Sequence, residues 1–135
     1  MAIFDAVNAA GSGMSAYRTW IDAIAHNVAN VNTVQPTSGN AFQAEYVLAQ
    51  PVNNGAVGGG VEVTGLGLGD PKGIVTYDPE NPQADAQGNV RMPDIDMGQQ
   101  MGNLIMAQRG FQANAAVVDR ARESYQSAID IGKKA

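Results

Sequence analysis

Apolar side chains near the N-terminus recur at steps that alternate between four and three residues. The positions are Ile3, Val7, Ala10, Met14, Tyr17, Ile21, Ile24, Val28 and Val31. Because an α-helix turns once in about 3.6 residues, this alternation puts them in one narrow stripe along a helix. Such a stripe is typical of a helix that packs against another helix, and it predicts a long helix from Ile3 to about Asn30.

A looser version of the same stripe occupies the C-terminal part of the chain. Its members are Met97, Met101, Leu104, Phe111, Ala115, Val118, Tyr125 and Ile129. Asp96 stands just before the first of them and Gln99 follows three residues later, which is the spacing of a helix-capping box. We therefore predict a second long helix that begins at Asp96 and ends before Gly132, since glycine often follows a helix end.

The chain between the two stripes has a different pattern. It contains all six prolines, and short runs in which apolar and polar residues alternate predict strands at residues 42–52, 61–70, 74–78 and 89–93. Residues 53–60 are rich in asparagine and glycine and predict a hinge or the tip of a hairpin. Strands this short cannot enclose a large core, so we expect a small, loop-rich β element.

These patterns predict a mainly α protein in which long N- and C-terminal helices pair as a coiled coil. Residues 1–34 would form the N-terminal helix, residues 35–95 the β region and residues 96–135 the C-terminal helix. We expect the helices to run antiparallel, with the β element projecting from one end. The helices would meet along an assembly seam made of Val7, Met14, Tyr17, Ile21, Ile24, Val28, Met101, Leu104, Phe111, Val118 and Tyr125.

Composition narrows the classes of function. The chain has 135 residues and a net charge of −5, which disfavours a nucleic-acid partner because such a partner requires a basic face. It has no cysteine, which excludes disulfides, thiolate nucleophiles and cysteine metal sites. No stretch is long and apolar enough to cross a bilayer, so we expect no direct membrane insertion. The N-terminus also lacks the basic start and apolar run of a cleavable secretory signal.

Candidate chemistry is sparse. His26 follows Asp22 by four residues, so a carboxylate could orient it as a general base, although a polar surface pair fits the same spacing. The glycines at positions 58–60, 65, 67 and 69 do not lead into a helix, as a phosphate-binding loop would. The acidic residues at 78–96 lack the ligand spacing of a calcium loop. We therefore predict no enzyme and expect no catalytic residue, cofactor or metal ion.

Three motifs resemble those of one known family. Residues 11–18 with Asp22 and residues 27–33 resemble the N-terminal signature of bacterial flagellar rod and hook proteins, and residues 105–114 resemble the C-terminal signature. Residues 77–95 are similar to a stretch typical of a proximal rod member of that family. The positions that match the motifs are Ser12, Gly13, Arg18, Asp22, Asn27, Asn30, Thr33, Arg109 and Asn114.

The resemblance implies a structural subunit of the flagellar basal-body rod. Such proteins are exported through the flagellar type III apparatus without a cleaved signal, and they polymerise into a drive shaft that crosses the periplasm. The implied partners are copies of the chain, other rod subunits and, during secretion, the export apparatus. An alternative from the pattern alone is a soluble adaptor or chaperone-like helical module that binds a partner's amphipathic helix.

Overall fold

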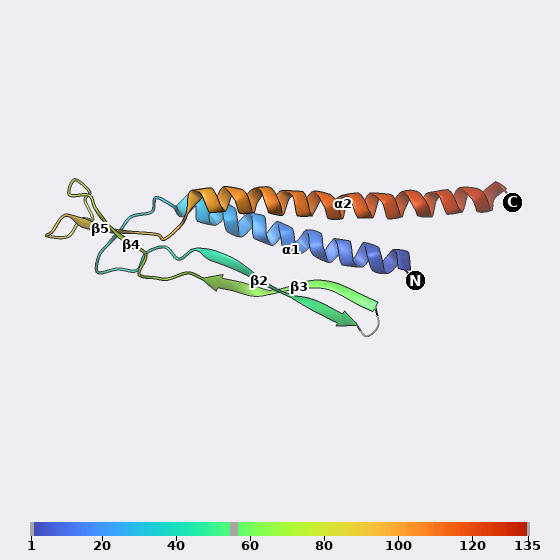
Figure 1. Cartoon of the computed structure of the whole chain (residues 1–135), viewed down its shortest axis with the longest axis horizontal. Helices are drawn as coiled ribbons and strands as arrows, with labels where there is room; N and C mark the ends of the chain where they lie inside the picture. The colour runs from blue at the N-terminus through green and yellow to red at the C-terminus, as the bar shows by residue number, and fades with distance from the viewer. Residues whose placement is uncertain (1, 55–56, 135) are drawn as a thin grey trace.

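A computed structural model describes residues 2–54 and 57–134. Two long helices, α1 (Ala2–Asn30) and α2 (Met97–Lys134), lie at the two ends of the chain. Between them come the strands β1 (Gln35–Pro36), β2 (Glu45–Asn54), β3 (Val57–Leu68), β4 (Ile74–Tyr77) and β5 (Asn89–Met92). The molecule is elongated, and both helices run along its length (Figure 1). This confirms the predicted class of two long helices with a small β element between them.

The helices are antiparallel, as predicted. The Phe4 ring meets the Tyr125 ring with a centroid distance of 6.3 Å near one end of the pair. Toward the other end, the amide of Asn27 donates from Nδ2 to Oε1 of Gln100 over 3.3 Å. The end of α2 extends past Ala2, where the described part of α1 begins (Figure 1), so its last turns lie beyond that helix.

The sequence predicted a cap at the start of α2 and a glycine stop at its end, and the structure confirms only the first. The predicted cap is present, because the backbone N–H of Gln99 donates to Oδ1 of Asp96 over 3.0 Å. The predicted stop at Gly132 is wrong, since the helix continues to Lys134. A glycine ends a helix where it adopts a left-handed backbone conformation, and Gly132 keeps the helical one.

The strands β2 and β3 form an antiparallel hairpin, with Glu45 opposite Leu68 and Pro51 opposite Val61. The hairpin lies along α1, on which it packs, instead of projecting from one end (Figure 1). The backbone N–H of Val61 donates to Oγ of Ser12 over 3.1 Å and fastens β3 to the helix. Gly60, with φ of 92°, lets the strand approach Ser12 where a Cβ would collide with the hydroxyl.

A second, three-stranded sheet in the order β1-β5-β4 stands at the end of the molecule where α1 finishes and α2 begins (Figure 1). All its pairs are antiparallel, and Val90 at its centre is 1% exposed. Strand β1 was not predicted, because two residues that include a proline carry no strand pattern. This sheet is the part of the β region that does project from the helices.

The core is thin and made largely of alanine. In the part of the chain that the structure describes, the buried apolar residues are Ala10, Ala23, Ile24, Ala41, Ala44, Val90 and Ala107. Small side chains let the elements approach closely, but they remove little apolar surface from water. Large apolar side chains therefore remain outside, among them Met97, Met101, Ile105, Met106, Leu48, Leu66 and Leu68.

Candidate functional site: a polar junction and two open apolar surfaces

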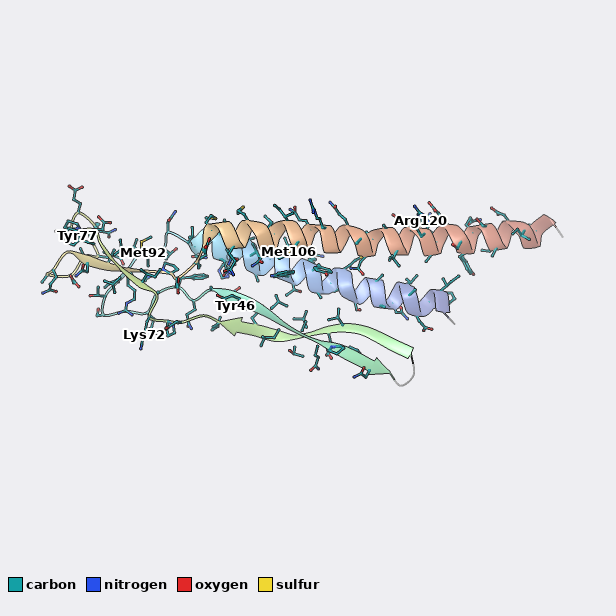
Figure 2. The ribbon with its side chains drawn as sticks, viewed as in Figure 1. Tyr46, Lys72, Tyr77, Met92, Met106 and Arg120 are labelled. Atoms are coloured by element: carbon teal, nitrogen blue, oxygen red, sulfur yellow. The ribbon has the colours of Figure 1, made fainter. Side chains whose placement is uncertain are left out.

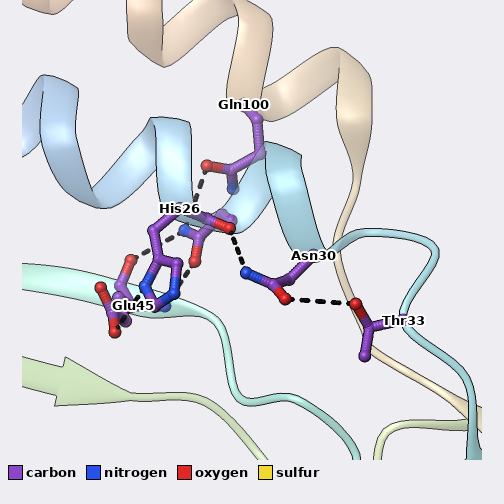
Figure 3. A network of polar contacts seen from close by, with 6 residues as sticks. His26, Asn30, Thr33, Glu45 and Gln100 are labelled. Carbon is purple, nitrogen blue, oxygen red and sulfur yellow. Dashed lines mark hydrogen bonds and ion pairs between the residues drawn. The ribbon is translucent and has the colours of Figure 1, made fainter.

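Asn27 joins three elements near the end of α1. Its side chain is 1% exposed. Its Oδ1 accepts the backbone N–H of Glu45 over 2.7 Å, and its Nδ2 donates to the backbone carbonyl of Glu45 over 2.9 Å. The same Nδ2 donates to Gln100, which is 3% exposed (Figure 3). One amide thus fixes α1, β2 and α2 relative to one another.

Two further motif residues, Asn30 and Thr33, form hydrogen bonds at the C-terminal end of α1, beside this junction. The side chain of Asn30 donates to the backbone carbonyl of His26 over 2.9 Å, and its Oδ1 accepts the hydroxyl of Thr33 over 3.2 Å (Figure 3). The backbone N–H of Thr33 also donates to the carbonyl of Asn30. The backbone bond occupies the Asn30 carbonyl, which the helix end leaves without a helical partner, and the side-chain bonds link Thr33 through Asn30 to the last turn of α1.

His26 has a different partner from the one its spacing suggested. Its Nδ1 lies 2.9 Å from Oε1 of Glu45, on the hairpin, and its ring meets the Phe42 ring edge-on at 5.2 Å. Asp22, the partner that the helical spacing suggested, is exposed. The carboxylate beside His26 comes instead from Glu45, so the pair links α1 to β2, a contact that spacing along one helix cannot show.

Glycines bring the two helices together. A Cβ on Gly13 would lie 2.9 Å from Oδ1 of Asn114, and a Cβ on Gly110 would enter the ring of Tyr17. Asn114 is held in turn by its Nδ2, which donates to the carbonyl of Gly110 over 2.8 Å. These two glycines are sites of close helix packing, a role that the sequence did not reveal.

The proposed seam residues differ in burial. Ile24 is 2% exposed, whereas Met101 and Tyr125 are 39% and 53% exposed. The others are half-buried: Val7, Met14, Tyr17, Ile21, Val28, Leu104, Phe111 and Val118. Most of the predicted stripe is therefore only partly covered by the chain itself.

The arginines of the motifs point to solvent. Arg18 and Arg109 are exposed, and neither guanidinium forms a hydrogen bond or ion pair with another residue that the structure describes. Residues 97–118 of α2 contain no other charge than Arg109, while residues 119–133 contain Asp119, Arg120, Arg122, Glu123, Asp130 and Lys133. The first part of α2 thus has an unusually uncharged surface, and its outward side chains stand clear of the rest of the chain (Figure 2).

A groove of about 540 Å³ lies between α1 and the hairpin. Its α1 side is formed by Ala9, Gly13 and Ala16, and its hairpin side by Val47, Ala49 and Val61. Tyr17, Trp20, Gly60 and Asn114 complete the lining, which contains no charged side chain. The groove is therefore a largely apolar recess that residues 2–54 and 57–134 leave open.

Thr37 ties the end sheet to the chain that leaves α1. Its hydroxyl donates to Oδ2 of Asp85 over 2.9 Å, and its carbonyl accepts Nη2 of Arg91 over 2.7 Å. The backbone N–H groups of Asn89 and Gln87 both donate to Oδ1 of Asp85 over 2.9 Å. The Asn89 amide, then the Thr37 hydroxyl, lower the pKa of the Asp85 carboxyl below its ordinary value.

Over residues 2–54 and 57–134, no three histidine, cysteine, aspartate or glutamate side chains gather as a metal site would require. Neither helix in those ranges is both long and apolar enough to cross a membrane.

Comparison with known proteins agrees with the motifs. Residues 8–37 match the family described as flagella basal body rod protein, and residues 86–131 match the family described as flagellar basal body rod FlgEFG protein C-terminal. The flagellar basal-body rod protein FlgC of Escherichia coli is 33% identical over 135 residues, covering 98% of this chain and 100% of the relative. The chain belongs to the FlgC family of flagellar basal-body rod proteins.

Other FlgC proteins are similar over nearly their whole length. That of Borreliella burgdorferi is 28% identical over 149 residues, covering 97% of this chain and 98% of the relative. That of Bacillus subtilis is 26% identical over 150 residues, covering 98% and 100%. As a FlgC family member, the chain is a structural subunit of the rod in the flagellar basal body, where it associates with other rod components.

Proposed function

We propose that the chain polymerises through its two terminal helices, with copies of itself and with other rod subunits, into the axial drive shaft of the flagellum. The observation that supports this most directly is the uncovered apolar surface of α2, where Ile105 and Met106 are 51% and 56% exposed. A lone soluble subunit gains nothing from such a surface, whereas an assembly buries it and gains free energy in proportion to the area.

The seam residues have two roles in this proposal. Ile24, nearly fully buried, holds the subunit together, while the half-buried and exposed members are completed by neighbours. Met101 is the most informative of the exposed group, because it lies in the uncharged part of α2. An aspartate there would leave the subunit intact and place a charge in the interface.

Secretion is the second part of the proposal. The chain would pass the flagellar type III export apparatus without a cleaved signal and in an extended state. A thin alanine core supports this, since a small buried apolar area makes unfolding before passage less costly.

We also propose that the chain is not an enzyme. His26, the candidate base, is engaged by Glu45 and Phe42, and this arrangement fits a link between the helix and the hairpin. Replacing His26 with alanine should therefore alter stability and rod formation together, without affecting any turnover.

The test of assembly is complementation of a strain that lacks this chain, followed by electron microscopy of isolated basal bodies. Without the chain we expect the rod to stop at its base. Met101→Asp should not restore it, while Asn8→Asp should, because Asn8 is exposed on α1 away from the apolar stripe. Both purified variants should show the helical circular dichroism of the parent. Full restoration by Met101→Asp would refute the proposed role of the helices.

A further inference from the structure

The α1–hairpin groove and the exposed face of α2 are two unpartnered surfaces of matching character. The groove is lined by uncharged residues, with Ala9, Gly13 and Ala16 on one side. The exposed face, which we call the α2 stripe, consists of Met97, Met101 and Ile105, which are 39%, 39% and 51% exposed. We propose that the α2 stripe of one copy packs into the groove of the next, a contact that would give the proposed polymerisation its specific interface.

The uncharged lining of the groove disfavours entry of the other helix surfaces of the chain, which carry charged side chains. A charged side chain entering an uncharged recess would lose its hydration and gain no opposite charge in return. The exposed side of α1 has Arg18, Asp22 and His26, and α2 beyond residue 118 is densely charged. Residues 97–108, by contrast, contain no charged residue, so the α2 stripe enters without that penalty.

The two surfaces also match in length. Residues at the spacing of Ala9, Gly13 and Ala16 lie on one face of α1 over about two turns, and those at the spacing of Met97, Met101 and Ile105 lie on one face of α2 over about two turns. Small residues on the α1 side make room for long side chains on the incoming helix, as Met and Ile would require.

Within one copy the two surfaces cannot satisfy each other. Among the described residues, no Cα of α2 lies within 8 Å of a Cα of β2 or β3. In the proposed contact each copy offers its stripe to one neighbour and its groove to another, which makes the contact heterologous; a reciprocal pair of copies would give linked dimers alone. Heterologous contacts propagate instead of closing into a pair, which is the requirement for a subunit that builds a shaft.

Cysteine cross-linking tests this contact without background, since the chain has no cysteine of its own. One variant combines Ile105→Cys in the stripe with Ala49→Cys in the groove. A disulfide needs Cα atoms about 4.4–6.8 Å apart, so these two positions cannot be joined within one copy. Rods isolated under reducing conditions and then oxidised should give a ladder of linked oligomers, and a mixture of the two single variants should give dimers alone.

The control variant combines Ile105→Cys with Asn8→Cys, which lies on the exposed side of α1 and should give no ladder. The purified double variants are also oxidised at high concentration, so that a failure to enter rods still leaves a readout. Dimers from Ile105→Cys alone would indicate a symmetric contact between stripes and would overturn the proposal. Normal rods without a ladder would also overturn it, while the proposed polymerisation would stand.

A second measurement uses the parent chain. Trp20 is its single tryptophan and lines the groove, so filling of the groove should shift its emission to shorter wavelength as the protein concentration rises. Ile105→Asp should abolish that shift. Association without a change in Trp20 emission would contradict occupation of the groove.

Discussion

Replacing Asn27 with alanine should destabilise the subunit more than any other single polar substitution on α1. The residue is 1% exposed and makes three hydrogen bonds, two with the backbone of Glu45 and one with the side chain of Gln100. Alanine removes all three and leaves their partners without replacements. Because these bonds join α1 to both β2 and α2, the loss affects two packing surfaces together.

The size of this destabilisation can be estimated from the groups of Glu45 and Gln100 that lose their hydrogen bonds. A buried polar group left without its hydrogen bond costs about 1–3 kcal/mol. We take the lower end, about 1 kcal/mol for each of the three bonds, because the Glu45 side chain is 19% exposed and water can approach that strand. Alanine also has a higher helix propensity than asparagine, which returns about 0.6 kcal/mol. The net loss is therefore about 2–3 kcal/mol in the free energy of unfolding.

Urea unfolding gives this quantity, with helical circular dichroism and Trp20 fluorescence as two probes. Asn8→Ala is the matched control, since Asn8 is an exposed asparagine on the same helix and gains the same propensity. The difference between the two variants should be about 3 kcal/mol, the cost of the three lost bonds. If Asn27→Ala and Asn8→Ala unfolded within about 0.5 kcal/mol of each other, the junction would not hold the elements together.

Three further predictions concern single positions. Gly110→Ala should lower the free energy of unfolding by about 1–3 kcal/mol, because the added Cβ would meet the Tyr17 ring. At Gly102 an added Cβ would meet nothing within 4 Å, so Gly102→Ala should raise the free energy of unfolding by up to about 1 kcal/mol, and equal effects of the two variants in thermal melts would contradict the close packing at Gly110. Asp96→Ala should cost about 1 kcal/mol through loss of the α2 cap, as measured by urea unfolding, and an unchanged midpoint would refute it. The lowered pKa of Asp85 stabilises the folded chain at pH values above the ordinary carboxyl pKa of about 3.9, and this stabilisation is lost as the pH falls through the pKa of the folded state. Asp85→Asn should therefore reduce the dependence of the unfolding free energy on pH below about 4, and an unchanged slope would count against the hydrogen bonds that we assign to Asp85.

Local patterns in the sequence were enough to predict the helices and the cap of the second one. The alternation of four and three residues from Ile3 onward indicates a helix directly, and Asp96 lies within reach of the amides that it caps. Strand β4 could be found for the same reason, since Ile74 to Tyr77 ends at a proline turn. Each of these features depends on neighbours along the chain.

Features that depend on distant residues could not be predicted. Asn27 and Glu45 are far apart in sequence, and nothing near either residue indicates that a side-chain amide will pair with that particular strand backbone. From the sequence alone, Gly13 and Gly110 only lower the helix propensity of their segments. Their role in close packing depends on the opposite helix, which places Asn114 against Gly13 and Tyr17 against Gly110. The position of the hairpin along α1 was missed likewise, because its bond from Val61 to Ser12 appears only once the chain is folded.

Two groups of residues, the motif residues inside the subunit and the large apolar residues on its surface, explain how a small core can support a defined shape. Asn27 and Gly13 contact other elements of the same chain and fix the distances between them, so the shape depends on hydrogen bonds and close approach more than on apolar burial. The large apolar side chains are thereby left free for the outer surface, where Ile105 and Met106 lie. A subunit built the other way, with those side chains inside, would be more stable alone and would have less to gain from its neighbours. The division therefore favours a chain that reaches its full stability only in the assembled rod.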